Sequence, residues 1–517
     1  MCAVNSPTQG RPGCAPVPDS LLSRNPLRWV TIFGPGAVIA SLTIGVGELV
    51  FSSRAGALFG YRLLWLFVLV LVLKWILVFA SARHIVFTGA HPFQRWMDLP
   101  GPRGWFPLVF FLLAVPCFPI WVCFHAGTVG TLLSSLTGTE HAWRGGAHLV
   151  WGIGVLAGVL ALSATGGYRA LERIQLIIVL LMLGSVLIAV LFLRPGWLEF
   201  LKGLLIPQPL AYPPWITAQS FPEVASRPVW LETTTYVGVI GGSSYDYLAY
   251  ASYLREKHWG RAGMSITSLG ELEKADPEAV RELRRWLRAP LVDCTLSFAA
   301  VLLFTAVFTV CGAVVLGPQH KVPGGSDLLS LQAEFVASVH PWLRHVYFAG
   351  AFLAVFGTLY GTVEVAPTIL RELAVAFRPA DANKLQPRLR LWSIAWVGAG
   401  GLVILVWTLL YHLRSGTNQP PGLIAILTPA NLFTGVLGCG LICLLNSWMD
   451  RRFLPRSLRP SRVANALSIG AGLMFITLGL RGCWDHSGWV AFAILAGTLL
   501  LGWVAAWLAA KWLGRAR

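Results

Sequence analysis

Apolar runs of roughly 20 residues recur along almost the whole chain after Arg28, and no other feature limits its fold as strongly. A helix of that length crosses a hydrocarbon core of about 30 Å. The chain is 56% hydrophobic and 12% charged, whereas soluble domains average about 25% charged residues, so a soluble fold is excluded. The pattern predicts an all-α polytopic membrane protein with about twelve transmembrane helices. We place them near residues 28–57, 61–88, 105–136, 147–167, 170–193, 230–254, 290–316, 342–370, 389–412, 421–447, 463–480 and 487–513.

The net charge of +17 is distributed unevenly along the chain. If the N-terminus is cytoplasmic, 29 of the 40 Lys and Arg residues fall on the inner side of the twelve spans and 10 on the outer side. Cytoplasmic loops of membrane proteins are enriched in basic residues in this way. The asymmetry predicts a multi-pass protein of a cell (inner) membrane with both termini in the cytoplasm. A nucleic-acid-binding surface is the weaker interpretation of the same charge.

The remaining sequence indicates one domain. Residues 1–27 are rich in Pro, Ser, Gly and Arg and lack the apolar core of a signal peptide, so they predict a disordered cytoplasmic tail. Residues 28–513 then form a single transmembrane transport domain. The nine cysteines are an odd number and most lie inside apolar runs, so no disulfide framework is indicated.

The first and the sixth runs each contain a glycine cluster and one carboxylate near the middle. The first reads GPGAVIASLTIGVGELVFSSRAG, in which Glu48 follows Gly45 and Gly47. The sixth reads TTTYVGVIGGSSYDYLAYASYLREK, in which Asp246 follows GGSS. Glycine weakens a helix, and non-helical backbone at membrane depth is tolerated only where protein buries it or water lines it. Both breaks are therefore predicted to face the inside of the bundle.

Each broken span opens a unit of five helices. The units are residues 28–193 and 230–447, and residues 463–513 add two helices. This order predicts an inverted-repeat five-plus-five (LeuT-like) fold, in which broken helices meet at the midplane and offer helix ends and freed carbonyls to a substrate. Glycines that only permit close helix packing are the alternative interpretation.

Three motifs follow one another between Gly34 and Gly89, namely GPG, AGALFGYRLLW and FASARHIVFTG. They closely resemble the opening of the Nramp family of divalent metal-ion transporters, where GPG, DPGN, AGA-x-FGYKLLW and LSAR-x-x-IVTG occur at the same spacing. YRALERIQ at residues 168–175 is similar to that family's fifth helix, and YGT at residues 360–362 to its eighth. The resemblance implies a five-plus-five transporter of a divalent cation.

The side chains with which that family binds its metal are missing here. Counted from GPG, the motif aspartate falls on Gly45 and the motif asparagine on Glu48. The sixth-helix methionine-proline-histidine motif falls on Gly242, Ser243 and Ser244, so these positions offer neither a thioether nor an imidazole. Carboxylate, hydroxyl and carbonyl oxygens favour hard ions such as Mg²⁺ or Mn²⁺ over soft transition metals. The chain resembles a divergent branch of the family.

The two breaks supply the candidate site. Glu48 and Asp246 are the candidate metal ligands, because a carboxylate at membrane depth is costly unless it faces a cavity or a partner. A structural pair with Lys74 or Arg54 is the alternative for either acid. The backbone and hydroxyl groups that complete the predicted site belong to Gly45, Gly47, Gly242, Ser243 and Ser244. Candidates for a proton pathway or a gate are Glu364, Lys74 and His125.

The sequence thus predicts a secondary-active transporter of a divalent cation that works by alternating access. A transporter of a small organic solute on the same fold is the alternative. A membrane-embedded enzyme is disfavoured, because the sequence contains no HExxH, P-loop or GxSxG motif. The predicted partners are the lipid bilayer and the transported solute, with no cofactor, no nucleic acid and no obligate protein partner.

Overall fold

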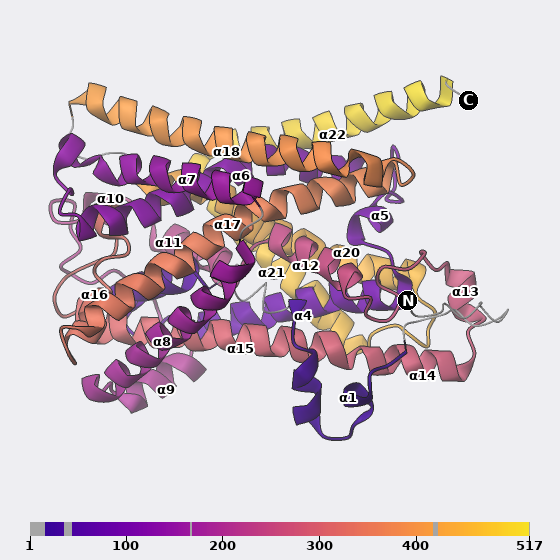
Figure 1. Cartoon of the computed structure of the whole chain (residues 1–517), viewed down its shortest axis with the longest axis horizontal. Helices are drawn as coiled ribbons and strands as arrows, with labels where there is room; N and C mark the ends of the chain where they lie inside the picture. Colours follow the sequence, from indigo (N-terminus) through magenta and orange to yellow (C-terminus); the bar gives the residue numbers. More distant parts are fainter. Residues whose placement is uncertain (1–15, 36–43, 166–167, 417–421, 516–517) are drawn as a thin grey trace.

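A computed structural model describes residues 16–35, 44–165, 168–416 and 422–515 of the chain. Every regular element in these ranges is a helix, so the predicted all-α class is confirmed (Figure 1). The long helices run along the longest axis of the molecule and form one bundle. A helix satisfies its own backbone hydrogen bonds, which is what a segment in lipid requires.

Nine helices in the described part of the chain are long and apolar enough to cross a membrane. The second part of α8 (Tyr168–Leu193), Val179–Leu193, and helix α9 (Trp197–Leu205) meet at a bend of 118° and count as a tenth span if they are taken together. Together with the interrupted first and sixth spans, they agree with the predicted set of about twelve. The nine comprise α4 (Leu64–Thr88), α6 (Trp105–Leu136), α7 (Ala147–Thr165), α14 (Pro277–Trp286) with α15 (Arg288–Cys311) and η4 (Gly312–Leu316), α17 (Leu343–Phe377), α18 (Ala382–Ser415), α19 (Leu423–Asn431) with η6 (Leu432–Leu437) and α20 (Gly438–Phe453), α21 (Arg462–Ser487) and α22 (Trp489–Arg515).

A glycine sets the C-terminal end of α4. Gly89 follows the helix with φ of 72°, and its N–H donates to the Ile85 carbonyl at 2.8 Å. Glycine takes this left-handed conformation without a Cβ clash and so ends the helix. A Cβ at this position would also stand 2.8 Å from the carbonyl oxygen of Arg261. The same glycine therefore lets the segment around Arg261 pack against the end of α4.

The sixth span is broken as predicted. Helix α11 (Val229–Val239) and helix α12 (Ser244–Glu256) are separated by residues 240–243. Gly241 and Gly242 have φ values of 83° and 94°. Most side chains rarely adopt this backbone region, so the glycine pair permits the break.

The first span is also interrupted. The 3₁₀ helix η1 (Pro26–Ile32) precedes a π-helical turn, η2 (Gly47–Phe51), which continues into α3 (Ser52–Phe59). Residues 36–43, which include part of the predicted glycine motif, lie outside the described ranges. Within the predicted tail, α1 (Asp19–Leu22) packs on the domain through a fully buried Leu21.

Helix α6 lies inside the bundle, in contact with α7, α17, α18 and α22. Helices α18, α21 and α22 instead expose large apolar side chains, among them Trp392 at 72% and Trp489 at 76%. Water would disfavour such surfaces, whereas lipid accommodates them. These helices therefore form part of the lipid-facing surface.

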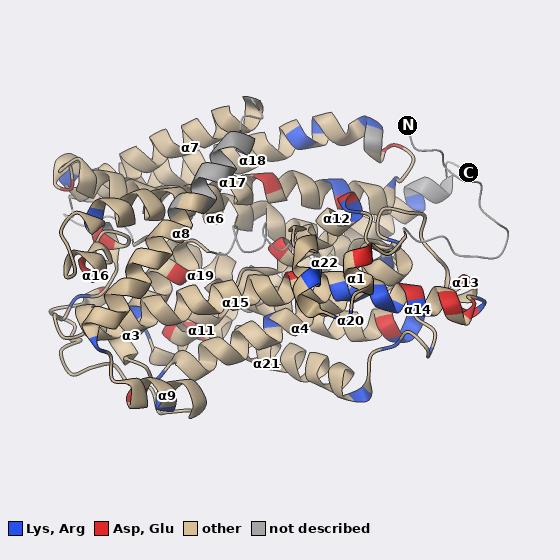
Figure 2. Cartoon of the chain, turned by 60° about the horizontal axis from the view of Figure 1, so that its bottom comes forward, with Lys and Arg blue, Asp and Glu red and all other residues tan. Residues whose placement is uncertain are grey.

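Shorter helices lie at the two ends of the bundle (Figure 1). One end carries α5 (Pro92–Trp96), α13 (Leu269–Glu273) and α14, and the other carries α10 (Pro222–Ala225) and α16 (Ala333–Ala337). Figure 2 shows Lys and Arg gathered around α14 and the nearby end of α20. Acidic and basic residues are few along the middle of the bundle, as in other membrane proteins.

Candidate functional site

The break in the sixth span leaves backbone groups that no helix satisfies. The N–H of Gly241 donates to Oε1 of Glu48 at 3.2 Å. The Tyr247 hydroxyl donates to the carbonyls of Gly241 and Gly242. Because an unpaired backbone group in a buried site costs free energy, these side chains stabilise the broken conformation.

Lys74 binds the same break from α4. Its ammonium donates to the carbonyl oxygens of Gly238, Ile240 and Gly242 at 3.0, 2.7 and 2.7 Å. The side chain is fully buried. An ammonium has three donors, and three carbonyls accept from this one, so Lys74 is held at the C-terminal end of α11.

Glu48 connects the first break with the sixth. One carboxylate oxygen accepts from the N–H of Gly241, and the other accepts from the N–H of Gly45 at 3.4 Å. The residue is fully buried. The carboxylate therefore stabilises backbone conformations of two spans that lie nearly 200 positions apart in the sequence.

Asp246 caps the second half of the sixth span. Its Oδ2 atom accepts from the backbone N–H of Ser243 at 2.7 Å and from the Ser243 hydroxyl at 2.9 Å. A carboxylate in the first turn also interacts favourably with the helix dipole. The capping contacts fix the side chain at the start of α12, next to the break.

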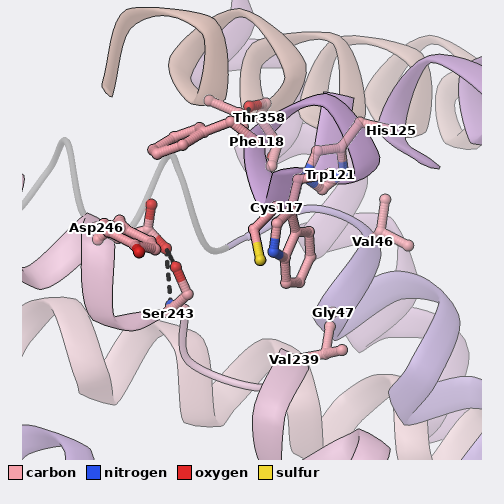
Figure 3. Close-up of a pocket in the computed structure, with 13 residues that line it drawn as sticks. Val46, Gly47, Cys117, Phe118, Trp121, His125, Val239, Ser243, Asp246 and Thr358 are labelled. Atoms are coloured by element: carbon pink, nitrogen blue, oxygen red, sulfur yellow. Dashed lines mark hydrogen bonds between the residues drawn. The ribbon is translucent and has the colours of Figure 1, made fainter. Parts of the chain in front are cut away.

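A small cavity of ≈ 40 Å³ lies between the two breaks (Figure 3). Asp246 and Ser243 border it on one side, and Cys117, Trp121 and His125 of α6 border it on another. A water molecule needs a cavity of at least about 10 to 15 Å³. The cavity therefore has room for a small ion or a few waters. The other residues that line it are Val46, Gly47, Phe118, Val239, Gly242, Tyr245, Thr358 and Thr362.

The structure divides the predicted site residues into two groups. The predicted residues that line the cavity are Gly47, Gly242, Ser243, Asp246 and His125. Those that lie outside its lining are Glu48, Gly45, Ser244, Lys74 and Glu364. Several of the second group still support the site, since Glu48 and Lys74 hold the break and a Cβ on Gly45 would stand 2.2 Å from Oγ1 of Thr358.

Sequence reasoning named His125 of α6 but missed the other residues that α6 and α17 bring to the cavity, among them Cys117 and Thr358. The breaks themselves offer no imidazole and no sulfur, but α6 brings His125 and Cys117 to the same cavity. Nδ1 of His125 is buried without a hydrogen-bond partner in the described part of the protein. An unsatisfied buried nitrogen is uncommon, so Nδ1 of His125 is free to bind a further group.

Arg54 does not pair with either acid of the breaks among the described residues. Its guanidinium binds Glu232 of α11 at 2.5 Å and the carbonyl of Pro323 at 2.7 Å. Arg227 binds the same carboxylate at 3.0 Å. The buried network joins α3 to α11, and it lies at the end of the bundle opposite α13 and α14.

A second, larger cavity of ≈ 510 Å³ opens at that end. Arg54 lines it together with the acids Glu140, Glu223 and Asp327, and it shares no lining residue with the small cavity. Partial burial and the neighbouring Glu140 carboxylate raise the pKa of Asp327. Acidic and basic side chains thus share the lining of this cavity.

Glu364 lies in an ion pair between helices. Arg390 of α18 donates to its Oε1 atom at 2.8 Å, and the Ser163 hydroxyl of α7 donates to the same atom at 2.6 Å. These contacts join α17 to α18 and α7. The geometry favours a role in helix packing for Glu364, and its role in a proton pathway or a gate stays a prediction.

The described residues include no group of three or more His, Cys, Asp or Glu side chains that could hold a metal ion. A bound ion would thus rely on backbone and hydroxyl oxygens as well as on carboxylates. Broken helices that meet at a small cavity within a helix bundle are typical of the five-plus-five class of membrane transporter.

Comparison with known proteins identifies the family. A family model described as "Natural resistance-associated macrophage protein-like" matches residues 36–485, so the chain belongs to the Nramp family. This family consists of transporters and not of enzymes, which excludes the membrane-embedded enzyme considered above.

Individual relatives match over shorter stretches. The divalent metal cation transporter MntH of Chromohalobacter salexigens is 27% identical over 200 residues, 36% of this chain and 42% of the relative. The metal transporter Nramp1 of Oryza sativa subsp. japonica is 26% identical over 195 residues, 35% of this chain and 34% of the relative. The aligned stretches therefore span less than half the length of these relatives.

The fold is similar to that of a solved manganese transporter of Eremococcus coleocola. The TM-score is 0.60 at 13% sequence identity, and the match covers 96% of each chain. The similarity confirms the predicted five-plus-five fold over nearly the whole length of the protein.

Proposed function

We propose that this protein carries a divalent cation across the membrane by alternating access and that it prefers hard ions such as Mg²⁺ or Mn²⁺. The carboxylate of Asp246 supports this proposal best, because it faces a cavity enclosed between two broken spans. Ser243, Thr358 and Thr362 also line this cavity, and carboxylate and hydroxyl oxygens are ligands that hard cations prefer. The names of the two relatives, both metal transporters, favour a metal substrate.

The size of the cavity favours an ion over an organic solute. A cavity volume of ≈ 40 Å³ holds only a few waters, since one water needs about 10 to 15 Å³ of such volume. Amino acids and other organic solutes need several times that space. The second candidate, an organic-solute transporter, has no such supporting observation.

Selectivity among metal ions provides the direct test of the proposal. In proteoliposomes, we expect Mn²⁺ uptake to be inhibited more strongly by Mg²⁺ than by Cd²⁺ at equal concentration, since the charged groups of the site are carboxylates. Cys117 is the one sulfur atom that lines the cavity among the described residues. A Cys117→Ser variant should therefore keep the same order. Stronger inhibition by Cd²⁺ that disappears in Cys117→Ser would contradict the preference for hard ions.

Alternating access requires that the outer half-helices separate. Here Arg54 and Glu232 join α3 to α11, and the larger outer cavity shares no lining residue with the central one. We infer that this ion pair opens when the site faces outward. Ion pairs that break and re-form are a common device in such transitions.

The membrane and the orientation are also part of the proposal. We place the protein in the cell (inner) membrane with both termini in the cytoplasm and without an obligate protein partner. The basic residues around α14 support this placement, because such clusters stay on the cytoplasmic side.

Cysteine labelling in intact cells tests the orientation. Thiol reagents that cannot cross the membrane should label Gln219→Cys from outside, and Ser265→Cys and Lys384→Cys only after the membrane is opened. All three positions are exposed. The described cysteines from Cys117 to Cys483 are buried, so replacing Cys2 and Cys14 by Ser gives a suitable background. Labelling of Ser265→Cys and Lys384→Cys from outside would show that the protein has the opposite orientation.

A further inference from the structure

The ammonium of Lys74 occupies a position that has the features of a cation site. Three backbone carbonyls, those of Gly238, Ile240 and Gly242, converge on it at 2.7 to 3.0 Å. Gly238 and Ile240 lie at the C-terminal end of α11, where the helix dipole is negative, and Gly242 lies in the break that follows. In transporters with broken helices, freed carbonyls and half-helix C-terminal ends coordinate cations.

We propose that Lys74 acts as a tethered cation, which fills the carbonyl site of the sixth-span break and so excludes a free metal ion from it. The inference rests on the proposed function for the identity of the substrate, a divalent cation. The break can then keep its conformation without any bound ion. The substrate ion is confined to the cavity beside Asp246, where the three carbonyls are not available to it.

The close packing of Gly241 against α4 keeps Lys74 beside the break. A Cβ on Gly241 would stand 2.7 Å from Cδ2 of Leu71 and 3.4 Å from Cδ of Lys74. A larger residue at position 241 would therefore push α4 and its lysine away from the break. Tyr247 supplies the remaining donor to the Gly241 carbonyl. Lys74 and Tyr247 thus donate to the carbonyls of the break, and Gly241 permits its backbone conformation.

Charge explains how the lysine would change the affinity for metal ions. Lys74 interacts electrostatically with both Glu48 and Asp246. The positive ammonium therefore opposes the approach of a free cation to these two carboxyl groups. Removing the ammonium should leave three carbonyls and two carboxylates that a metal ion from solution can fill. The variant protein should thus depend on added cations for its stability.

The experiment compares thermal unfolding of the purified protein in choline, Na⁺, Mg²⁺ and Mn²⁺ at matched ionic strength. Lys74→Met removes both charge and donors, and Lys74→Gln keeps donors without the charge. We expect both to melt at lower temperature than the natural protein in choline and to regain about 5 °C or more when a small cation is added. Lys202→Met, a change at an exposed lysine of α9, is the matched control and should respond as the natural protein does.

Several outcomes are decisive. Lys74→Arg keeps the charge, so it should melt independently of added Na⁺ like the natural protein. Variants that no cation stabilises, or that fail to fold even when purified with Mg²⁺ throughout, would overturn the inference. Stabilisation of Lys74→Met by Na⁺ but not by Mg²⁺ or Mn²⁺ would support a tethered cation and contradict divalent transport. If the natural protein takes up Mn²⁺ normally but no cation raises the melting temperature of Lys74→Met, the result would support divalent cation transport and contradict the tethered cation.

Discussion

Replacing Asp246 by Asn is expected to abolish cation uptake and to leave the protein folded. Asn retains an oxygen that can accept from the Ser243 backbone and hydroxyl, which are 2.7 and 2.9 Å from the carboxylate. The cap of α12 should therefore persist. The variant loses the negative charge that faces the cavity, and a contact with a charged group contributes about 1.5 to 3 kcal/mol. We expect affinity for Mn²⁺ to fall by about 10- to 100-fold.

The measurement combines isothermal titration of Mn²⁺ with uptake and thermal unfolding of the same preparation. Asp381→Asn is the matched control, because Asp381 is exposed at the start of α18 and makes no capping contact there. It should bind and transport like the natural protein. Full uptake by Asp246→Asn would show that the transported ion binds elsewhere in the protein. A large drop in melting temperature would instead show that Asp246 acts mainly as a helix cap.

The sequence predicted the broken spans well because glycine acts locally. Gly241 and Gly242 adopt backbone angles that their neighbours would resist, and this preference can be identified without any knowledge of the fold. The acid after the break was also visible, since a carboxylate in an apolar run is rare. Local chemistry thus predicted the fold class and the position of Asp246 beside the cavity.

The other wall of the cavity could not be predicted in the same way. Cys117, Trp121 and Thr358 lie in long helices with ordinary apolar sequence, and only tertiary packing brings them to the breaks. The lysine shows a related limit. An acid was the expected alternative partner of Lys74, but the hydrogen-bond partners in the structure are backbone carbonyls. Because every residue has a backbone carbonyl, the sequence does not indicate which of them accept.

Glu48→Gln is expected to lower the stability of the protein by about 1 to 3 kcal/mol, the cost of leaving a buried hydrogen-bond donor without its acceptor. Glu48 accepts backbone N–H groups of Gly241 and Gly45 through two different oxygens. A glutamine has one oxygen, so its NH₂ group would face one of the two N–H donors. Thermal and denaturant unfolding measure the loss. Glu256→Gln, which changes a carboxylate that is 65% exposed, is the control and should unfold normally.

Combining Glu48→Gln with Lys74→Met separates the two possible roles of Glu48. If the carboxylate and the ammonium together stabilise the break, each single change leaves the other charge unbalanced. The double variant should then be more stable than the sum of the single effects predicts, by about 0.5 to 3 kcal/mol. Strictly additive losses would show that the two groups act independently. A Glu48→Gln protein that melts normally but no longer binds Mn²⁺ would show that Glu48 is a ligand of the ion. Loss of a carboxylate that stabilises the break would instead lower the melting temperature.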